Sequence, residues 1–139
     1  MRRIVRVAAF AFVGVASAAA GADQQAPTTS GQALFAANCS NCHGRYGEGG
    51  GPAGADLPRT PPDLRRLAAR NGGVFPRDRV AEIIDGRATV AAHADRSMPV
   101  WGDAFAKLDP DAKSPSEAQA RAKAKIDALV DFLASIQQP

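Results

Sequence analysis

Cys39-Ser40-Asn41-Cys42-His43 is the stretch around which the rest of this 139-residue chain is organised. Two cysteines three positions apart, followed at once by a histidine, form the attachment pattern of c-type haem. The spacing suits that chemistry because two thiols about one helical turn apart can each add to a vinyl group of the same porphyrin. The adjacent imidazole can then turn toward the iron. The motif therefore predicts one covalently bound haem with His43 as an axial ligand.

Two other kinds of site can be built from the same residues. Cys39 and Cys42 are the only cysteines of the chain, and in an exported protein they could form a disulfide. With His43 they could also bind zinc, but zinc usually takes four ligands and the chain has no second Cys or His pair. His93 would have to be recruited alone. The haem interpretation uses the histidine that a disulfide would leave without a role.

The first residues are typical of a secretory signal. Three arginines precede an apolar run over residues 7–20, and Ala20-Gly21-Ala22 is a small-residue cleavage pattern. We expect residues 1–22 to be a signal peptide cut before Asp23, which makes the mature protein periplasmic. An uncleaved membrane anchor is the alternative, but the run is shorter than the ~20 residues that span a bilayer.

Removal of the signal changes the charge of the protein. The full chain has 17 Lys and Arg against 14 Asp and Glu, with a sequence pI near 9.2. The signal takes away three arginines and no acidic residue, which leaves 14 of each. A polybasic surface for nucleic acid or for a membrane is therefore not expected.

The mature chain reads as a flexible leader followed by one helical domain. Residues 23–29 are polar, with no apolar periodicity, and the domain is expected over residues 30–139. Thr29 is the expected N-cap of a first helix that ends near residue 38, and Gln32 would complete a capping box. Gly31 is a poor helix residue, and a close helix crossing is one reason for a glycine there.

The middle of the chain is predicted to consist of loops and short helices. Residues 44–62 are rich in Gly and Pro, so no regular element is expected there. A phosphate-binding loop is excluded because no strand precedes the glycines and no G-K-[ST] follows them. Short helices are expected over residues 63–70 and 76–86, and residues 87–106 are expected to be loop.

The last helix has the clearest start signal. Ser114 fits the N-cap, Pro115 the first turn and Glu117 the capping box. Apolar residues then recur at helical spacing, which predicts a terminal helix packed on one face, against the first helix. The residues of this stripe are Ile126, Leu129, Val130, Leu133 and Ile136, with Phe132 beside them.

In this order the features resemble the class I cytochrome c family over residues 31–136. A helix precedes the attachment motif, Met98-Pro99 follows it, and a terminal helix carries Leu129 and Phe132. The resemblance implies an all-α, cytochrome c-like fold, with helices and long loops wrapped around one covalently bound haem. It also implies that Gly31 and Phe132 meet where the first and last helices cross.

The resemblance also implies contacts to the haem ligands. The carbonyl oxygen of Pro52 would accept a hydrogen bond from His43 Nδ1, which orients the ring. Trp101 would belong to the haem environment, either through its indole N–H at a propionate or through ring packing.

Met98 is the predicted sixth ligand of the iron. Met1 leaves with the signal, so Met98 is the one methionine of the mature chain. A thioether favours ferrous iron and so raises the reduction potential relative to a second imidazole. Core packing is the ordinary role of a methionine, but this one lies in a loop. His93 is the rival ligand, and Lys107 and Lys113 are weaker rivals because a lysine must lose its proton to bind iron.

Other residues have open roles at this stage. Tyr46 could line the haem crevice or be exposed. The arginines at positions 59, 87 and 96 could neutralise haem propionates, face a partner, or be solvated. Residues 107–116 add a polar stretch that the compact family pattern lacks, and we interpret it as a surface insertion.

The function implied by the resemblance is one-electron transfer in the periplasm by a protein that is not itself an enzyme. Its partners would be redox proteins: a dehydrogenase or quinol-oxidising complex as donor, and a terminal oxidase or reductase as acceptor. It would be a monomer, or a haem c subunit of an enzyme complex. The remaining alternative is a haem protein whose methionine ligand dissociates so that a gas or peroxide can bind.

Overall fold

The computed structural model describes residues 30–88 and 98–139. Within these ranges the chain forms helices and connecting loops, with no strand. This confirms the predicted all-α fold. The helices in chain order are α1 (Gly31–Asn38), α2 (Ser40–His43), the 3-10 helices η1 (Pro52–Asp56) and η2 (Leu64–Arg66), α3 (Leu67–Arg70), α4 (Arg77–Asp85), α5 (Trp101–Lys107) and α6 (Pro115–Ser135).

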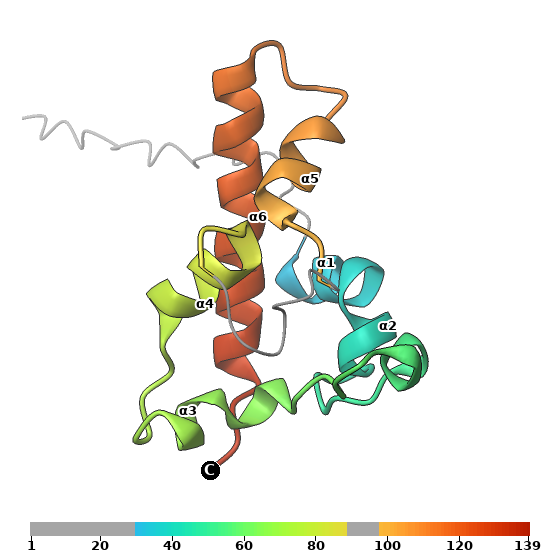
Figure 1. The fold of residues 1–139 in the computed structure, drawn as a ribbon. Coiled ribbons are helices and arrows are strands. Elements are labelled where there is room, and N and C mark those ends of the chain that lie inside the picture. The colour runs from blue at the N-terminus through green and yellow to red at the C-terminus, as the bar shows by residue number, and fades with distance from the viewer. Residues whose placement is uncertain (1–29, 89–97) are drawn as a thin grey trace, which may run out of the picture.

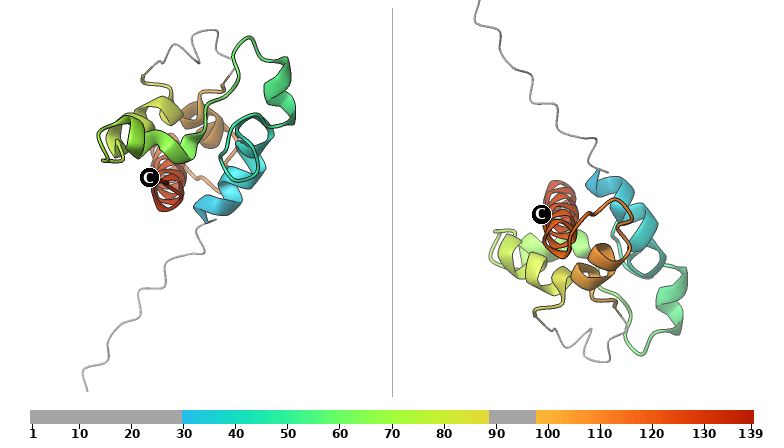
Figure 2. Two further views of the ribbon diagram at one scale, coloured as in Figure 1. Left: turned by 90° about the horizontal axis from the view of Figure 1, so that it is seen from below. Right: turned by 90° about the horizontal axis from the view of Figure 1, so that it is seen from above.

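Helix α6 is the centre of the fold. It is the longest helix, and α1, α4 and α5 all pack against it (Figure 1). Seen along the axis of α6, α1 and α2 lie on one side and α3 and α4 on the other (Figure 2). Helix α2, which carries part of the attachment motif, therefore lies on the opposite side of α6 from α3 and α4.

The core follows the apolar stripe of α6 that the sequence predicts. Ile126, Leu129, Val130 and Leu133 are buried. They meet buried side chains from the three neighbouring helices: Leu34 and Phe35 from α1, Val80 and Ile84 from α4, and Phe105 from α5. Ser114 caps α6 as predicted, since its Oγ accepts a hydrogen bond from Glu117 N at 3.2 Å. The Glu117 carboxylate accepts from Lys113 N, one residue before the cap.

The predicted close crossing of the first and last helices is confirmed. A Cβ atom on Gly31 would lie 1.9 Å from the Ala128 carbonyl oxygen and 2.8 Å from Phe132 Cβ. Beside this contact the rings of Phe35 and Phe132 pack with their centroids 5.3 Å apart. Glycine is needed at position 31 because any side chain would separate α1 from α6.

Two details of the predicted helix boundaries are wrong. Ser30, not Thr29, is the N-cap of α1, and its Oγ accepts from Ala33 N at 3.2 Å. The capping box with Gln32 is therefore absent, because the residue three positions after the cap is Ala33. Pro76 is the N-cap of α4 rather than a residue of its first turn. Both shifts are of one residue, which is the usual error of capping signals.

Two segments predicted as loop contain helices. Residues 101–107 form α5, although Gly102 is a poor helix residue, because Phe105 is buried against α6. Pro52 begins the 3-10 helix η1 within the Gly- and Pro-rich segment. Such a short 3-10 helix needs little intrinsic propensity, and proline is well suited to its first position.

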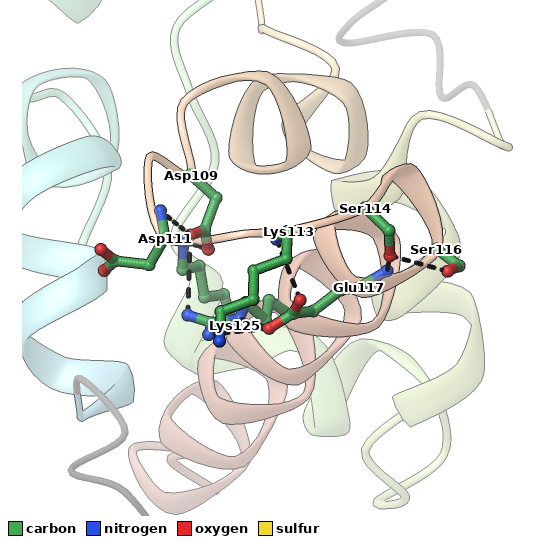
Figure 3. A network of polar contacts seen from close by, with 8 residues as sticks. Asp109, Asp111, Lys113, Ser114, Ser116, Glu117 and Lys125 are labelled. Atoms are coloured by element: carbon green, nitrogen blue, oxygen red, sulfur yellow. Dashed lines mark hydrogen bonds and ion pairs between the residues drawn. The ribbon is translucent and has the colours of Figure 1, made fainter.

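The predicted insertion, residues 107–116, is joined to α6 by ion pairs (Figure 3). Only 6% of the Asp109 side chain is exposed. Its carboxylate accepts from Lys125 Nζ at 3.0 Å and from Asp111 N at 3.2 Å. The insertion therefore has a fixed attachment to the central helix.

Several predictions lie outside the described residues. They concern the signal peptide over residues 1–22, the leader over 23–29, and the side chains of His93 and Arg96. In the two described ranges, no helix combines the length and the apolar character that crossing a bilayer requires.

Candidate functional site: a cavity beside the cysteine motif

The attachment motif lies where α1 passes into α2. Cys39 is the residue between the two helices, and its carbonyl oxygen accepts from Cys42 N at 3.2 Å and from His43 N at 2.9 Å. Cys39 and Cys42 are therefore one helical turn apart, as their spacing predicts. Both are half-buried, whereas His43 is 8% exposed and is the one buried polar or charged residue of the described ranges.

The glycine-rich segment folds back onto α2. Gly51 N donates to the Cys42 carbonyl oxygen at 3.0 Å, and Gly49 N donates to that of His43 at 2.7 Å. A Cβ atom on Gly51 would lie 2.5 Å from the Asn41 carbonyl oxygen, so this approach requires glycine. Pro52 follows directly, exposed at the start of η1. The hydrogen bond from His43 Nδ1 to the Pro52 carbonyl stays a prediction.

One cavity brings the predicted haem residues together. Both cysteines, His43, Met98 and Trp101 line it, although Met98 is 55 positions beyond His43 in the sequence. The remaining lining residues are Asn38, Leu57, Arg59, Pro61, Pro62 and Pro99. We call this the cysteine-side cavity.

A second cavity shares His43, Met98 and Pro62 with the first. It has a volume of about 380 Å³, within the ~300–1,000 Å³ typical of small-molecule sites. Its other lining residues are apolar apart from one arginine: Leu64, Leu67, Arg70, Val80, Ile83, Ile84 and Leu133. We call this the apolar cavity.

The residues around the two cavities fit a haem c. A porphyrin is a large apolar plate, and the aliphatic side chains of the apolar cavity match that character. An imidazole and a thioether, the ligand pair of cytochromes c, line both cavities. Two thiols line the cysteine-side cavity. Arg59 and Arg70 are the charged lining residues, and both are cationic, which suits the two carboxylates of a haem.

The cysteines are free thiols rather than a disulfide. Burial raises the pKa of the Cys39 thiol to about 11, with a further contribution from a charge on Cys42. Cys39 therefore carries its proton at neutral pH, and a neutral thiol is slow to oxidise. Among the described residues, no three His, Cys, Asp or Glu side chains lie close enough to hold a metal ion, so the zinc alternative gains no support.

The other candidates divide into residues at the cavity and residues away from it. The Trp101 ring is half-buried and packs against Phe105 with centroids 5.2 Å apart. Arg59 lines the cysteine-side cavity. Tyr46 is 63% exposed, with Arg45 over its ring, and it lines neither cavity. Arg87 forms an exposed ion pair with Asp85.

Sequence reasoning missed much of the apolar cavity. The stripe of Val80, Ile83 and Ile84 is predicted as one apolar face, but its pattern does not distinguish core packing from a cofactor cavity. Leu64 and Leu67 also line the cavity and carry no signal beyond a three-residue spacing. No sequence signal marks Arg70 as a residue of the cavity, and only its position among apolar side chains in the structure identifies it.

Comparison with known proteins agrees with this geometry. A family model described as "Cytochrome c" matches residues 28–137. No curated protein and no solved structure gives a significant match.

Proposed function

The chain belongs to the cytochrome c family, and on this premise we propose that it carries single electrons in the periplasm through one covalently bound haem. Membership of the family implies that the protein binds haem c and has an electron-transfer role. The single covalent haem, the His43/Met98 ligand pair and the periplasmic location are our proposal. The observation that carries it is that His43 and Met98 line both cavities, and that the two cysteines line the cysteine-side cavity with them.

Cys39 and Cys42 would hold the haem by thioether bonds. In each bond the sulfur adds to one vinyl carbon, and the thiol hydrogen passes to the other, so the step needs no oxidant or reductant. It does need reduced, unpaired thiols, and both cysteines are free. Their fixed separation of one helical turn matches two vinyl groups of one porphyrin.

His43 and Met98 would supply the two axial ligands. When bound, the haem accepts and releases one electron at its iron. With a protein ligand on each side, the iron needs no bond to a substrate, which favours electron transfer over catalysis. The thioether of Met98 would favour the ferrous form and hold the reduction potential above that of a His/His site.

The proposed location and partners follow from the sequence and the family. The signal pattern over residues 1–22 supports export to the periplasm. The donor would be a dehydrogenase or quinol-oxidising complex, and the acceptor a terminal oxidase or reductase. The equal count of basic and acidic residues after residue 22 gives no support to nucleic acid as a partner.

The visible spectrum of purified holoprotein tests this function. Wild type should retain haem under denaturing conditions and, when oxidised, show the weak sulfur–iron band of methionine ligation. Met98→Ala should lose that band, whereas the matched variant His93→Ala should keep it. A wild type without covalently bound haem would overturn the proposal. Loss of the band in His93→Ala alone would overturn the His43/Met98 pair, and ready binding of carbon monoxide to the reduced protein would favour an open site.

A further inference from the structure

Gln137, the second residue after α6, joins that helix to the chain segment beside His43. Its side-chain Oε1 accepts a hydrogen bond from Ala68 N at 2.8 Å. Its Nε2 donates to the carbonyl oxygens of Leu64 at 2.9 Å and of Leu133 at 2.7 Å. All three bonds are partly buried. One carboxamide therefore connects the end of α6 with η2 and α3.

The segment that Gln137 holds forms part of the apolar cavity. Leu64 and Leu67 line that cavity together with His43, and Leu133 lines it from α6. At Leu64 the segment is also held by a main-chain bond, because Leu64 N donates to the Gly47 carbonyl oxygen at 2.7 Å. We call residues 64–68 the cavity segment.

The cavity segment depends on such contacts for its shape. η2 has three residues and α3 has four, and helices this short do not persist on their own intrachain hydrogen bonds. Leu64 and Leu67 are only half-buried, so apolar packing fixes them less firmly than it fixes the core of α6. The Gln137 carboxamide supplies a bond at each end of the segment, at Leu64 and at Ala68.

We propose that Gln137 is a positioning residue that keeps the cavity segment closed over the His43 side of the haem and thereby raises the reduction potential. The proposal rests on the function proposed above, because it places the haem in this cavity. Oxidised haem carries one more positive charge than reduced haem, so a dry apolar surrounding disfavours the oxidised form. Opening of the segment would admit water and lower the potential.

The adjacent glutamines Gln137 and Gln138 allow a matched test on the holoprotein. Gln137→Ala removes the carboxamide, and Gln137→Leu keeps a side chain of similar size while removing the hydrogen bonds. Gln138→Ala is the control, because Gln138 is exposed and reaches the cavity segment only through its main-chain N–H to Arg65. The readouts are the midpoint potential and the hydrogen-exchange rate of the Ala68 amide. We expect both Gln137 variants to have faster Ala68 exchange and a lower potential than wild type, and Gln138→Ala to match wild type in both.

Each of the other possible results would overturn the proposal for a different reason. Unchanged Ala68 exchange and potential in the Gln137 variants would show that the bonds do not hold the segment. Faster exchange with an unchanged potential would make the role of Gln137 only structural. A wild-type potential in Gln137→Leu, with a lowered one in Gln137→Ala, would assign the effect to side-chain volume. A wild type without bound haem would overturn the proposed function itself, before any variant is compared.

Discussion

Gly31 of α1 lies directly against the main chain of Ala128 in α6, so that a Cβ atom at residue 31 would stand 1.9 Å from the Ala128 carbonyl oxygen. The obstacle is backbone in the middle of the longest helix and cannot rotate away. Helix α1 ends next to Cys39, and it also contributes Phe35, one of the most buried side chains of the core. The position of this glycine therefore determines how the attachment motif is held against the centre of the fold.

Gly31→Ala should destabilise the protein. Alanine is the better helix residue by up to about 1 kcal/mol, but the overlap forces α1 away from α6, and overpacking of this kind typically costs about 1–3 kcal/mol. The cost of overpacking should exceed the gain in helix propensity, because the neighbouring atom belongs to the main chain of α6 and cannot move aside. Chemical denaturation of variant and wild type measures the difference. Ala37→Ser, on the exposed side of α1, should change the free energy of unfolding by no more than about 0.5 kcal/mol. Equal stability of Gly31→Ala and wild type would contradict the close crossing.

Ser30→Ala should cost about 0.5–2 kcal/mol, the usual range for loss of an N-cap. Its Oγ is the acceptor for Ala33 N at the start of α1. Thr29→Ala is the natural comparison, because the sequence pattern predicts Thr29 as the cap, and this change should have the smaller effect. Thermal unfolding of the two variants shows which residue is the N-cap of α1. A larger loss of stability in Thr29→Ala than in Ser30→Ala would favour Thr29 as the cap and contradict the structure.

The sequence predicts the parts of this fold that depend on local chemistry. Ser114 and Pro115 mark the start of α6, and the apolar stripe marks its buried face, so both are correctly predicted. The Glu117 carboxylate accepts from Lys113 N rather than from Ser114 N, as the predicted capping box would require. The helical turn of the cysteine motif is predictable for the same reason, because the hydrogen bonds from Cys42 N and His43 N to the Cys39 carbonyl oxygen are local.

The parts that the sequence does not predict are decided by distant residues. Helix α5 contains Gly102 and is only seven residues long, and its packing against α6 decides its conformation. Gln137 looks like an ordinary polar residue because its partners Leu64 and Ala68 lie 73 and 69 positions away. That Met98 and His43 line the same cavities could be expected from the family resemblance and from Met98 being the one methionine after residue 22, but no local pattern in the sequence between them determines how the chain returns to the cysteine motif.

Gly102→Ala should destabilise the contact between α4 and α5. A Cβ atom there would lie 2.0 Å from Asp85 Oδ1 and 2.9 Å from the Asp85 carbonyl oxygen. The carboxylate can move aside but the carbonyl cannot, so we expect a loss of about 1–3 kcal/mol in chemical denaturation. Gly102→Ala combined with Asp85→Ala should recover part of the loss relative to Asp85→Ala alone, because the closer of the two obstacles has been removed. Strictly additive effects of the two substitutions would contradict this contact.

The ion pair between Asp109 and Lys125 should make the attachment of the insertion sensitive to acid. Hydrogen bonding from Lys125 holds the pKa of the Asp109 carboxyl below its usual 3.8, with smaller contributions from Asp111 N–H and the charge of Arg121. Because the folded pKa is lowered, the stabilisation is fully present above the unfolded pKa and is lost as pH falls through the folded pKa. In the close view, the Asp111 carboxylate points away from Lys125, which makes Asp111 a control (Figure 3).

A double-mutant cycle of Asp109→Asn and Lys125→Met measures the coupling of the pair. The coupling free energy from urea unfolding should be favourable and constant at about pH 6, and should shrink toward zero as the pH falls through the lowered pKa of Asp109 and the carboxylate gains its proton. Added salt should reduce it at the higher pH, because Lys125 is partly exposed. The same cycle with Asp111→Asn should show little coupling at either pH. A coupling that persists unchanged at the lower pH would mean that packing of Lys125 over the Phe105 ring, rather than the charge of Asp109, attaches the insertion to α6.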